Sequence, residues 1–121
     1  MDSTLKTATV GMRVGVFHSC TKDALLLFGY GLYEADEVPP EGIFGPSGPM
    51  STLEMPLPKL RLDDGLIIWG CEAWWCPEAE VQAMAQGRVI IRPKIESQRK
   101  KNLEAWEKAC HDLDEIEENL P

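Results

Sequence analysis

The segment that decides the fold is residues 59–77, which reads Lys-Leu-Arg-Leu-Asp-Asp-Gly-Leu-Ile-Ile-Trp-Gly-Cys-Glu-Ala-Trp-Trp-Cys-Pro. Leu60 and Leu62 alternate with charged residues, which is the period-two pattern of a strand with one buried face. An Asp-Asp-Gly turn follows, and Gly65 can adopt the positive φ that a tight hairpin requires. Residues 66–69 are continuously apolar, as in a strand covered on both faces. The segment therefore predicts a central β-hairpin.

The end of this segment carries two adjacent tryptophans and leads into a helix. In an extended chain neighbouring side chains point to opposite faces, so we expect one of Trp74 and Trp75 in the core. The favoured reading is that both are packed, and the alternative is that the other lies at the surface, where a tryptophan often marks a contact site. Pro77 suits a first helical position, and Gly87 suits a helix end. A short helix is predicted between them.

The rest of the chain supplies further strands and one long helix. Alternating apolar residues predict strands over residues 12–17 and 25–33. A short apolar run predicts another strand over residues 88–93, and a three-four apolar spacing predicts a helix over residues 95–120. Residues 38–58 are rich in proline and glycine, which excludes regular helix or central strand. We expect a long loop there that covers a pocket or reaches a partner chain.

Gly29 and Gly31 interrupt the second predicted strand. Glycines inside a strand let it coil sharply or let another group approach its backbone. Sharp coiling is the favoured reading, and room for a ligand beside Tyr30 or Tyr33 is the alternative. We therefore expect an α+β fold with a small, strongly curled, barrel-like antiparallel sheet of about five strands, one short helix and a long C-terminal helix. The chain is expected to be one domain, with its sheet core in residues 10–93.

The bulk composition narrows the classes of function. The chain has 121 residues and a formal net charge of −8 at pH 7. Duplex affinity comes mainly from neutralised phosphates, so we expect no direct DNA binding, and no attraction to anionic membranes. Residues 1–10 lack the apolar core of a signal peptide, and no apolar run is long enough to span a membrane. The expected location is the cytoplasm.

The nucleophilic and metal-ligating residues give no recognisable catalytic pattern. The four cysteines show no Cys-x-x-Cys spacing, so we expect free thiols and no bound metal. The alternative is a zinc site, because four cysteines are enough ligands for one zinc ion. The sequence has no glycine-rich phosphate loop, no Gly-x-Ser-x-Gly elbow and no His-Glu-x-x-His. We expect a protein that is not an enzyme and needs no cofactor. The cysteines are Cys20, Cys71, Cys76 and Cys110.

The C-terminal helix carries an apolar stripe that suggests self-association. A helix of about 24 residues is about 36 Å long, which exceeds what a domain of this size needs. Part of the stripe is therefore expected to meet another protomer, and we predict a homo-oligomer. The predicted interface residues are Leu103, Trp106, Cys110 and Leu113.

Charge is distributed unevenly along the C-terminal third. Basic residues gather in residues 88–101, whereas residues 104–118 hold seven acidic residues against one lysine. A basic start is unfavourable for the helix dipole. Three readings remain open: a solvated charge run, pairing with the acidic end of a neighbouring helix in an antiparallel dimer, and a bound anion such as phosphate.

Several motifs together resemble short proteins carried by bacteriophages and prophages. The motifs are Gly29-Tyr-Gly-Leu-Tyr-Glu34, Asp36-Glu-Val-Pro-Pro40, Leu60-Arg-Leu-Asp-Asp-Gly65 and Trp69-Gly-Cys-Glu-Ala-Trp-Trp75, and they lie between Phe28 and Pro77. The layout is similar to that of the phage sponges that counter Thoeris defence. This resemblance implies a viral anti-defence protein in the host cytoplasm that sequesters a cyclic ADP-ribose isomer or a cyclic oligonucleotide and performs no chemistry. It transfers no individual site residue.

A nucleotide needs aromatic faces for its bases and cations for its phosphates. We expect both in this chain, and alanine at Arg92 and Arg99 should then abolish nucleotide binding while the fold remains. The predicted ligand-binding residues are Tyr30, Trp74, Trp75, Arg88, Arg92, Lys94 and Arg99.

Two other functions remain open. The acidic helix and the proline-rich loop suit an inhibitor that binds a host defence protein, for example by imitating a nucleic acid. The chain also suits a small structural or assembly protein of a phage, whose oligomer is its function.

Overall fold

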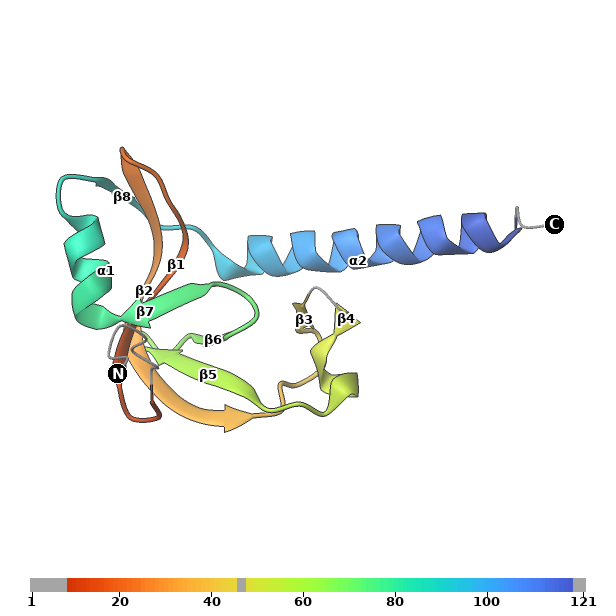
Figure 1. Ribbon diagram of the computed structural model, residues 1–121, viewed down its shortest axis with the longest axis horizontal. Coiled ribbons are helices and arrows are strands. Elements are labelled where there is room, and N and C mark those ends of the chain that lie inside the picture. The colour runs from red at the N-terminus through yellow and green to blue at the C-terminus, as the bar shows by residue number, and fades with distance from the viewer. Residues whose placement is uncertain (1–8, 46–47, 119–121) are drawn as a thin grey trace, which may run out of the picture.

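The computed structural model describes residues 9–45 and 48–118. It is an α+β fold with a mostly antiparallel sheet, in the order β6-β5-β2-β1-β7 (Figure 1). A short strand, β8, pairs with the first residues of β2 and is the one parallel neighbour in the described sheet. The strands are β1 (Arg13–Cys20), β2 (Ala24–Glu37), β5 (Leu57–Leu62), β6 (Ile67–Trp69), β7 (Trp74–Pro77) and β8 (Val89–Ile91).

The sheet is open, so the prediction of a strongly curled, barrel-like sheet is wrong. Strands β6 and β7 are its two ends, and no described pairing joins them. Gly31 instead allows β5 to pack closely against β2. A Cβ at this position would lie 2.1 Å from the carbonyl oxygen of Arg61 in β5. A Cβ on Gly15 would lie 2.6 Å from the Cβ of Val81. These glycines let neighbouring elements approach closely, which was the alternative use of glycine in a strand.

Strand β2 continues to Glu37, four residues beyond its predicted end at Tyr33. Its last residues pair with β5, whose cations neutralise its carboxylates. Arg61 Nε donates to Glu34 Oε1 at 2.6 Å, and Lys59 Nζ lies 3.3 Å from Glu37 Oε1. Cross-strand charge pairs of this kind stabilise a sheet. These ion pairs explain why the acidic residues at the end of β2 remain in a strand.

The two faces of the sheet have separate apolar cores. On one face Val16, Leu60 and Ile68 are fully buried with Ile95, the first residue of the long helix. On the other face Leu25 and Leu27 pack against Val81 of the short helix α1 (Glu78–Ala85). One face is therefore covered by α1, and the other is contacted by the first residue of α2.

The helices begin and end near the predicted residues. Pro77 precedes α1 rather than forming its first turn, and Gly87 adopts a φ of 76° just beyond its end. The long helix α2 (Ile95–Glu118) begins against the sheet and then projects away from it (Figure 1). Within the described part of the chain, no helix is both long and apolar enough to cross a membrane.

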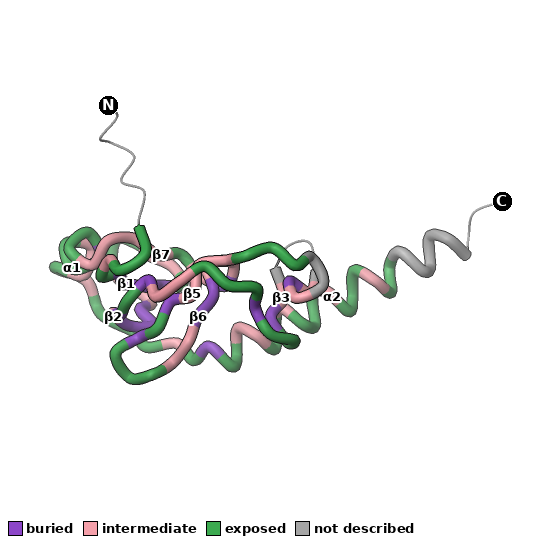
Figure 2. Tube along the Cα trace, turned by 90° about the horizontal axis from the view of Figure 1, so that it is seen from below, coloured by how far each residue is buried: buried purple, intermediate pink, exposed green. Residues whose placement is uncertain are grey.

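The proline-rich loop contains short regular pieces: β3 (Phe44–Gly45), β4 (Gly48–Pro49) and the 3-10 helix η1 (Met50–Leu53). Ile43 and Met50 pack with Trp69 in a third small core. This segment lies beside the first half of α2 (Figure 1). Figure 2 shows that buried residues gather in the sheet, this segment and the start of α2. The loop is thus packed onto the protein, which places its aromatic residue Phe44 at the candidate site.

Candidate functional site

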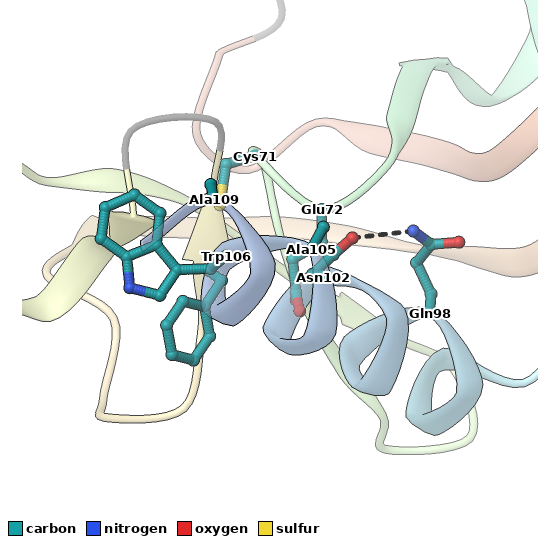
Figure 3. Close-up of a pocket in the computed structure, with 8 residues that line it drawn as sticks. Cys71, Glu72, Gln98, Asn102, Ala105, Trp106 and Ala109 are labelled. Atoms are coloured by element: carbon teal, nitrogen blue, oxygen red, sulfur yellow. Dashed lines mark hydrogen bonds between the residues drawn. The ribbon is translucent and has the colours of Figure 1, made fainter. Parts of the chain in front are cut away.

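Two adjoining hollows form a groove between the β6–β7 connection and α2. The first has a volume of about 530 Å³ and is bounded by Trp74 and Trp75. The second has a volume of about 390 Å³ and is bounded by Phe44 and Trp106 (Figure 3). Both hollows are also lined by Cys71, Glu72 and Gln98. The result is one groove with an aromatic wall near each end.

The base of the groove is fixed by an ion pair between Glu72 and Arg99. The Glu72 carboxylate is fully buried, and it accepts from Arg99 Nε at 2.7 Å and from Arg99 Nη2 at 2.9 Å. It also accepts from the backbone N–H of Trp69 at 3.0 Å, and Arg99 Nη2 donates to the carbonyl oxygen of Ile67 at 2.8 Å. The hydrogen bond to Glu72 raises the pKa of Arg99. This pair attaches α2 to the turn between β6 and β7.

The wall at the sheet end consists of two tryptophans in different states. Trp75 packs edge-on against the ring of Tyr33, with centroids 5.3 Å apart, whereas Trp74 is 70% exposed. The favoured prediction that both tryptophans are packed is therefore wrong, because Trp75 is half-buried against the core whereas Trp74 lies at the surface. Tyr33 donates a hydrogen bond to Asp36, and this bond raises the pKa of Tyr33 to about 12. Trp75 is thus held by the core, and Trp74 offers a free ring face beside the hollow.

The polar groups of the groove come from α2 and β1. Gln98 Nε2 donates to Asn102 Oδ1 at 2.9 Å, so the side-chain amides four residues apart are aligned along one face of the helix (Figure 3). His18 lies at the sheet end of the groove. These side chains offer donors and acceptors between the aromatic walls.

The pKa values of Cys71 and Cys76 are raised. Burial, followed by the charge of Glu72, raises the pKa of Cys71 to about 11, so this thiol is protonated at neutral pH and is a poor nucleophile. Burial also raises the pKa of Cys76. Among the residues that the structure describes, no group of three His, Cys, Asp or Glu is placed to hold a metal ion.

The structure brings only part of the predicted nucleotide site together. Trp74 and Trp75 line the groove, whereas Arg99 does not: its guanidinium is engaged by Glu72, and it lines a separate hollow of about 680 Å³. Tyr30 and Arg92 share a separate hollow of about 220 Å³ with two aspartates. The predicted aromatic and basic residues therefore occupy different places.

The remaining predicted cations differ in their contacts. Arg88 donates to the carbonyl oxygens of Met84 at 2.5 Å and Thr21 at 2.6 Å, so it joins the end of α1 to the β1–β2 turn. Lys94 is exposed and directly precedes α2. Arg88 is thus a structural residue, whereas Lys94 is accessible to a ligand.

The predicted oligomer stripe lies partly within the groove. Trp106 is half-buried and contributes to the second hollow. Leu103 is 38% exposed, and Cys110 is half-buried. The side chain of Leu113 lies outside the described residues.

Sequence reasoning missed the amide pair Gln98 and Asn102 and the buried Glu72. A signal existed for Glu72, because a carboxylate between Trp69 and Trp74 in an otherwise apolar run needs a cation when it is buried. Its partner is 27 residues away in the sequence, so the pairing itself required the fold.

Comparisons with protein-family models, with curated protein sequences and with solved structures find no match to this chain. What the groove binds is therefore inferred from its own side chains.

Proposed function

We propose that this protein is a non-enzymatic binding protein that sequesters a nucleotide in the groove between β7 and α2. The observation that carries the proposal is the 70% exposed ring of Trp74 beside a hollow of about 530 Å³. Ligand pockets in proteins typically have volumes of about 300–1,000 Å³. An exposed tryptophan on a firmly held strand is a ready stacking surface for a base.

The base is recognised by stacking and by amide hydrogen bonds. The ring of Trp74 provides the stacking face, and its neighbour Trp75 is held in place by Tyr33. The side-chain amide of Gln98 reaches the same hollow and can both donate to and accept from the edge of a base. Stacking on an aromatic ring contributes about 1–3 kcal/mol per base, so Trp74 supplies a large share of the affinity.

The phosphates are bound by lysines of α2 rather than by Arg99, whose guanidinium is engaged by the buried Glu72. Lys94 lies four residues before Gln98 and Lys101 three residues after it, and both lysines are exposed. Residues at these spacings share one side of a helix. An ammonium group at each position provides a point charge for a phosphate beside the stacked base.

The biological role that fits this binding is the one implied by the resemblance to phage sponges. The ligand is then a cyclic ADP-ribose isomer or a cyclic oligonucleotide, held without turnover inside the host cell. The protonated thiol of Cys71 supports a role without covalent chemistry. The acidic half of α2 favours the second candidate, a protein that binds a host defence complex or assembles in a phage particle.

A thermal-shift screen of the full chain tests the proposal. The probes are cyclic dinucleotides, cyclic trinucleotides, cyclic ADP-ribose isomers, ADP-ribose and NAD. A ligand at a hundredfold excess over its Kd stabilises the folded state by about 2.7 kcal/mol, which raises Tm by several degrees. The absence of a shift with every probe would contradict the proposal and favour a protein partner.

Calorimetric titration of the best probe then locates the site. Trp74→Ala should weaken binding by about 5- to 150-fold, the equivalent of one lost stacking contact, while Trp74→Phe retains most of the affinity. Lys101→Ala should also weaken binding. Lys22→Ala is its matched control, because Lys22 is equally exposed but lies in the β1–β2 turn. Equal affinity of Trp74→Ala and the unaltered protein would exclude this groove.

A further inference from the structure

The second half of α2 extends beyond the rest of the described protein. The groove residues of this helix end at Ala109, whereas the helix continues to Glu118 (Figure 1). Isolated helices shorter than about 12–15 residues are marginal in water, because most helix stability in proteins comes from packing of an apolar face. The projecting end therefore needs a partner, and its sequence indicates which one.

Four apolar positions of α2 are symmetric along the helix. Leu103, Trp106, Cys110 and Leu113 are separated by three, four and three residues. Leu103 is as far before position 108 as Leu113 is after it, and the same is true of Trp106 and Cys110. A stripe with this symmetry matches a second copy of itself that runs in the opposite direction, as a two-fold interface requires.

The charges of α2 select the same antiparallel arrangement. In this register Lys100 lies alongside Asp114 of the second copy. Glu107 meets its own counterpart near the axis, and the two symmetric Lys100–Asp114 pairs offset this like-charge contact. A parallel pair would instead place all the acidic ends together. Opposite charges at such flanking positions set the orientation of paired helices.

We propose that a second copy of this chain covers the projecting helix, and that two α2 helices pair antiparallel about a two-fold axis at position 108. The described part of the interface consists of Leu103, which is 38% exposed, and the half-buried Trp106 and Cys110. Lys101 and Lys108 fall on the opposite side of the helix, seven residues apart and away from the stripe. Pairing therefore leaves Lys101 accessible, and the dimer does not depend on the proposed nucleotide site.

Sedimentation velocity of the full chain tests the stoichiometry. The expected mass is twice the 13.5 kDa of one chain, at protein concentrations of tens of micromolar. Leu103→Glu should convert the dimer to a monomer, because it places a charge in the apolar stripe. Ser97→Glu is the matched control, since it adds the same side chain at an exposed position of the same helix outside the stripe, and it should remain dimeric. A monomeric unaltered protein, or a dimeric Leu103→Glu variant, would overturn the proposal.

Disulfide trapping tests the direction of the pair. The variant carries Leu103→Cys and Leu113→Cys together with Cys110→Ser, and mild oxidation is followed by peptide mapping. Antiparallel pairing predicts crosslinks between positions 103 and 113 of different chains. Crosslinks of 103 to 103 and of 113 to 113 would show parallel pairing and overturn the proposal. Calorimetry of Leu103→Glu with a nucleotide tests the groove separately, so failure of one proposal is distinguishable from failure of the other.

Discussion

The two halves of α2 belong to one continuous helix, but they differ in their contacts with the rest of the protein. The first half is attached by the buried side chain of Ile95, by the Glu72–Arg99 pair and by Trp106 in the groove. The second half, residues 110–118, continues beyond the groove. The difference shows that tertiary contacts, rather than helix propensity alone, hold a segment of a helix in place.

The largest expected effect is at the attachment of the first half. Arg99→Met leaves the Glu72 carboxylate buried without its cation, and removal of one partner of a buried pair costs about 3–5 kcal/mol. Urea denaturation measures the free energy of unfolding. Arg61→Met is the control, because its pair with Glu34 is exposed and should cost at most about 1 kcal/mol. Equal losses in the two variants would show that the Glu72–Arg99 pair does not secure the helix.

The next effect concerns the apolar contact at the helix start. Ile95 is 1% exposed within the core on one sheet face, so Ile95→Ala should cost about 3 kcal/mol through lost burial and a cavity. Ile90→Ala in the exposed strand β8 is the control and should cost less than about 1 kcal/mol. The same denaturation experiment compares them. A small loss at Ile95 would mean that α2 is attached mainly by its ion pair.

Hydrogen exchange compares the two halves directly. In the monomeric variant Leu103→Glu, amides of residues 110–118 should exchange at least about tenfold faster than those of residues 98–106, because the helix end opens locally at little cost. In the unaltered dimer the second half should gain protection. Uniform protection along α2 in the monomer would show that the helix end needs no partner.

The smallest effect concerns the wall of the groove, far from the helix end. The hydrogen bond to Asp36 raises the pKa of Tyr33 to about 12, above the ordinary value of 10.0. This bond therefore contributes stability that is fully present below pH 10 and is lost as the pH rises through about 12. In a spectrophotometric titration, Asp36→Ala should lower the pKa of Tyr33. An unchanged titration curve would contradict the role of this hydrogen bond.

Local patterns in the sequence predicted the elements well. The hairpin after Leu62, the end of α1 at Gly87 and the start of α2 all depend on residues close in sequence. The open sheet was not predicted, because Gly31 fits either a sharp curl or a close neighbour, and only the position of Arg61 decides between them. Residues adjacent in sequence, such as Trp74 and Trp75, can also have different surroundings in the fold.

The candidate site was predicted only at Trp74 and Trp75. Arg88, Arg92 and Arg99 are near one another in sequence, but the fold places them at the end of α1, at a hollow beside Tyr30 and in the pair with Glu72. Whether a cation is free or engaged depends on a partner distant in sequence, such as Glu72 for Arg99. That information exists only in the folded chain.

The attachment of α2 through its first part places the sheet at one end of the helix and leaves residues 110–118 beyond the groove. In the proposed pair, the start of each helix at Ile95 lies 13 positions from the two-fold axis at position 108, which at 1.5 Å per residue is about 20 Å of helix. The two sheets would therefore lie at opposite ends of the pair, about 40 Å apart along the helices. The length of α2 would then set the spacing between the two sheets of the assembly.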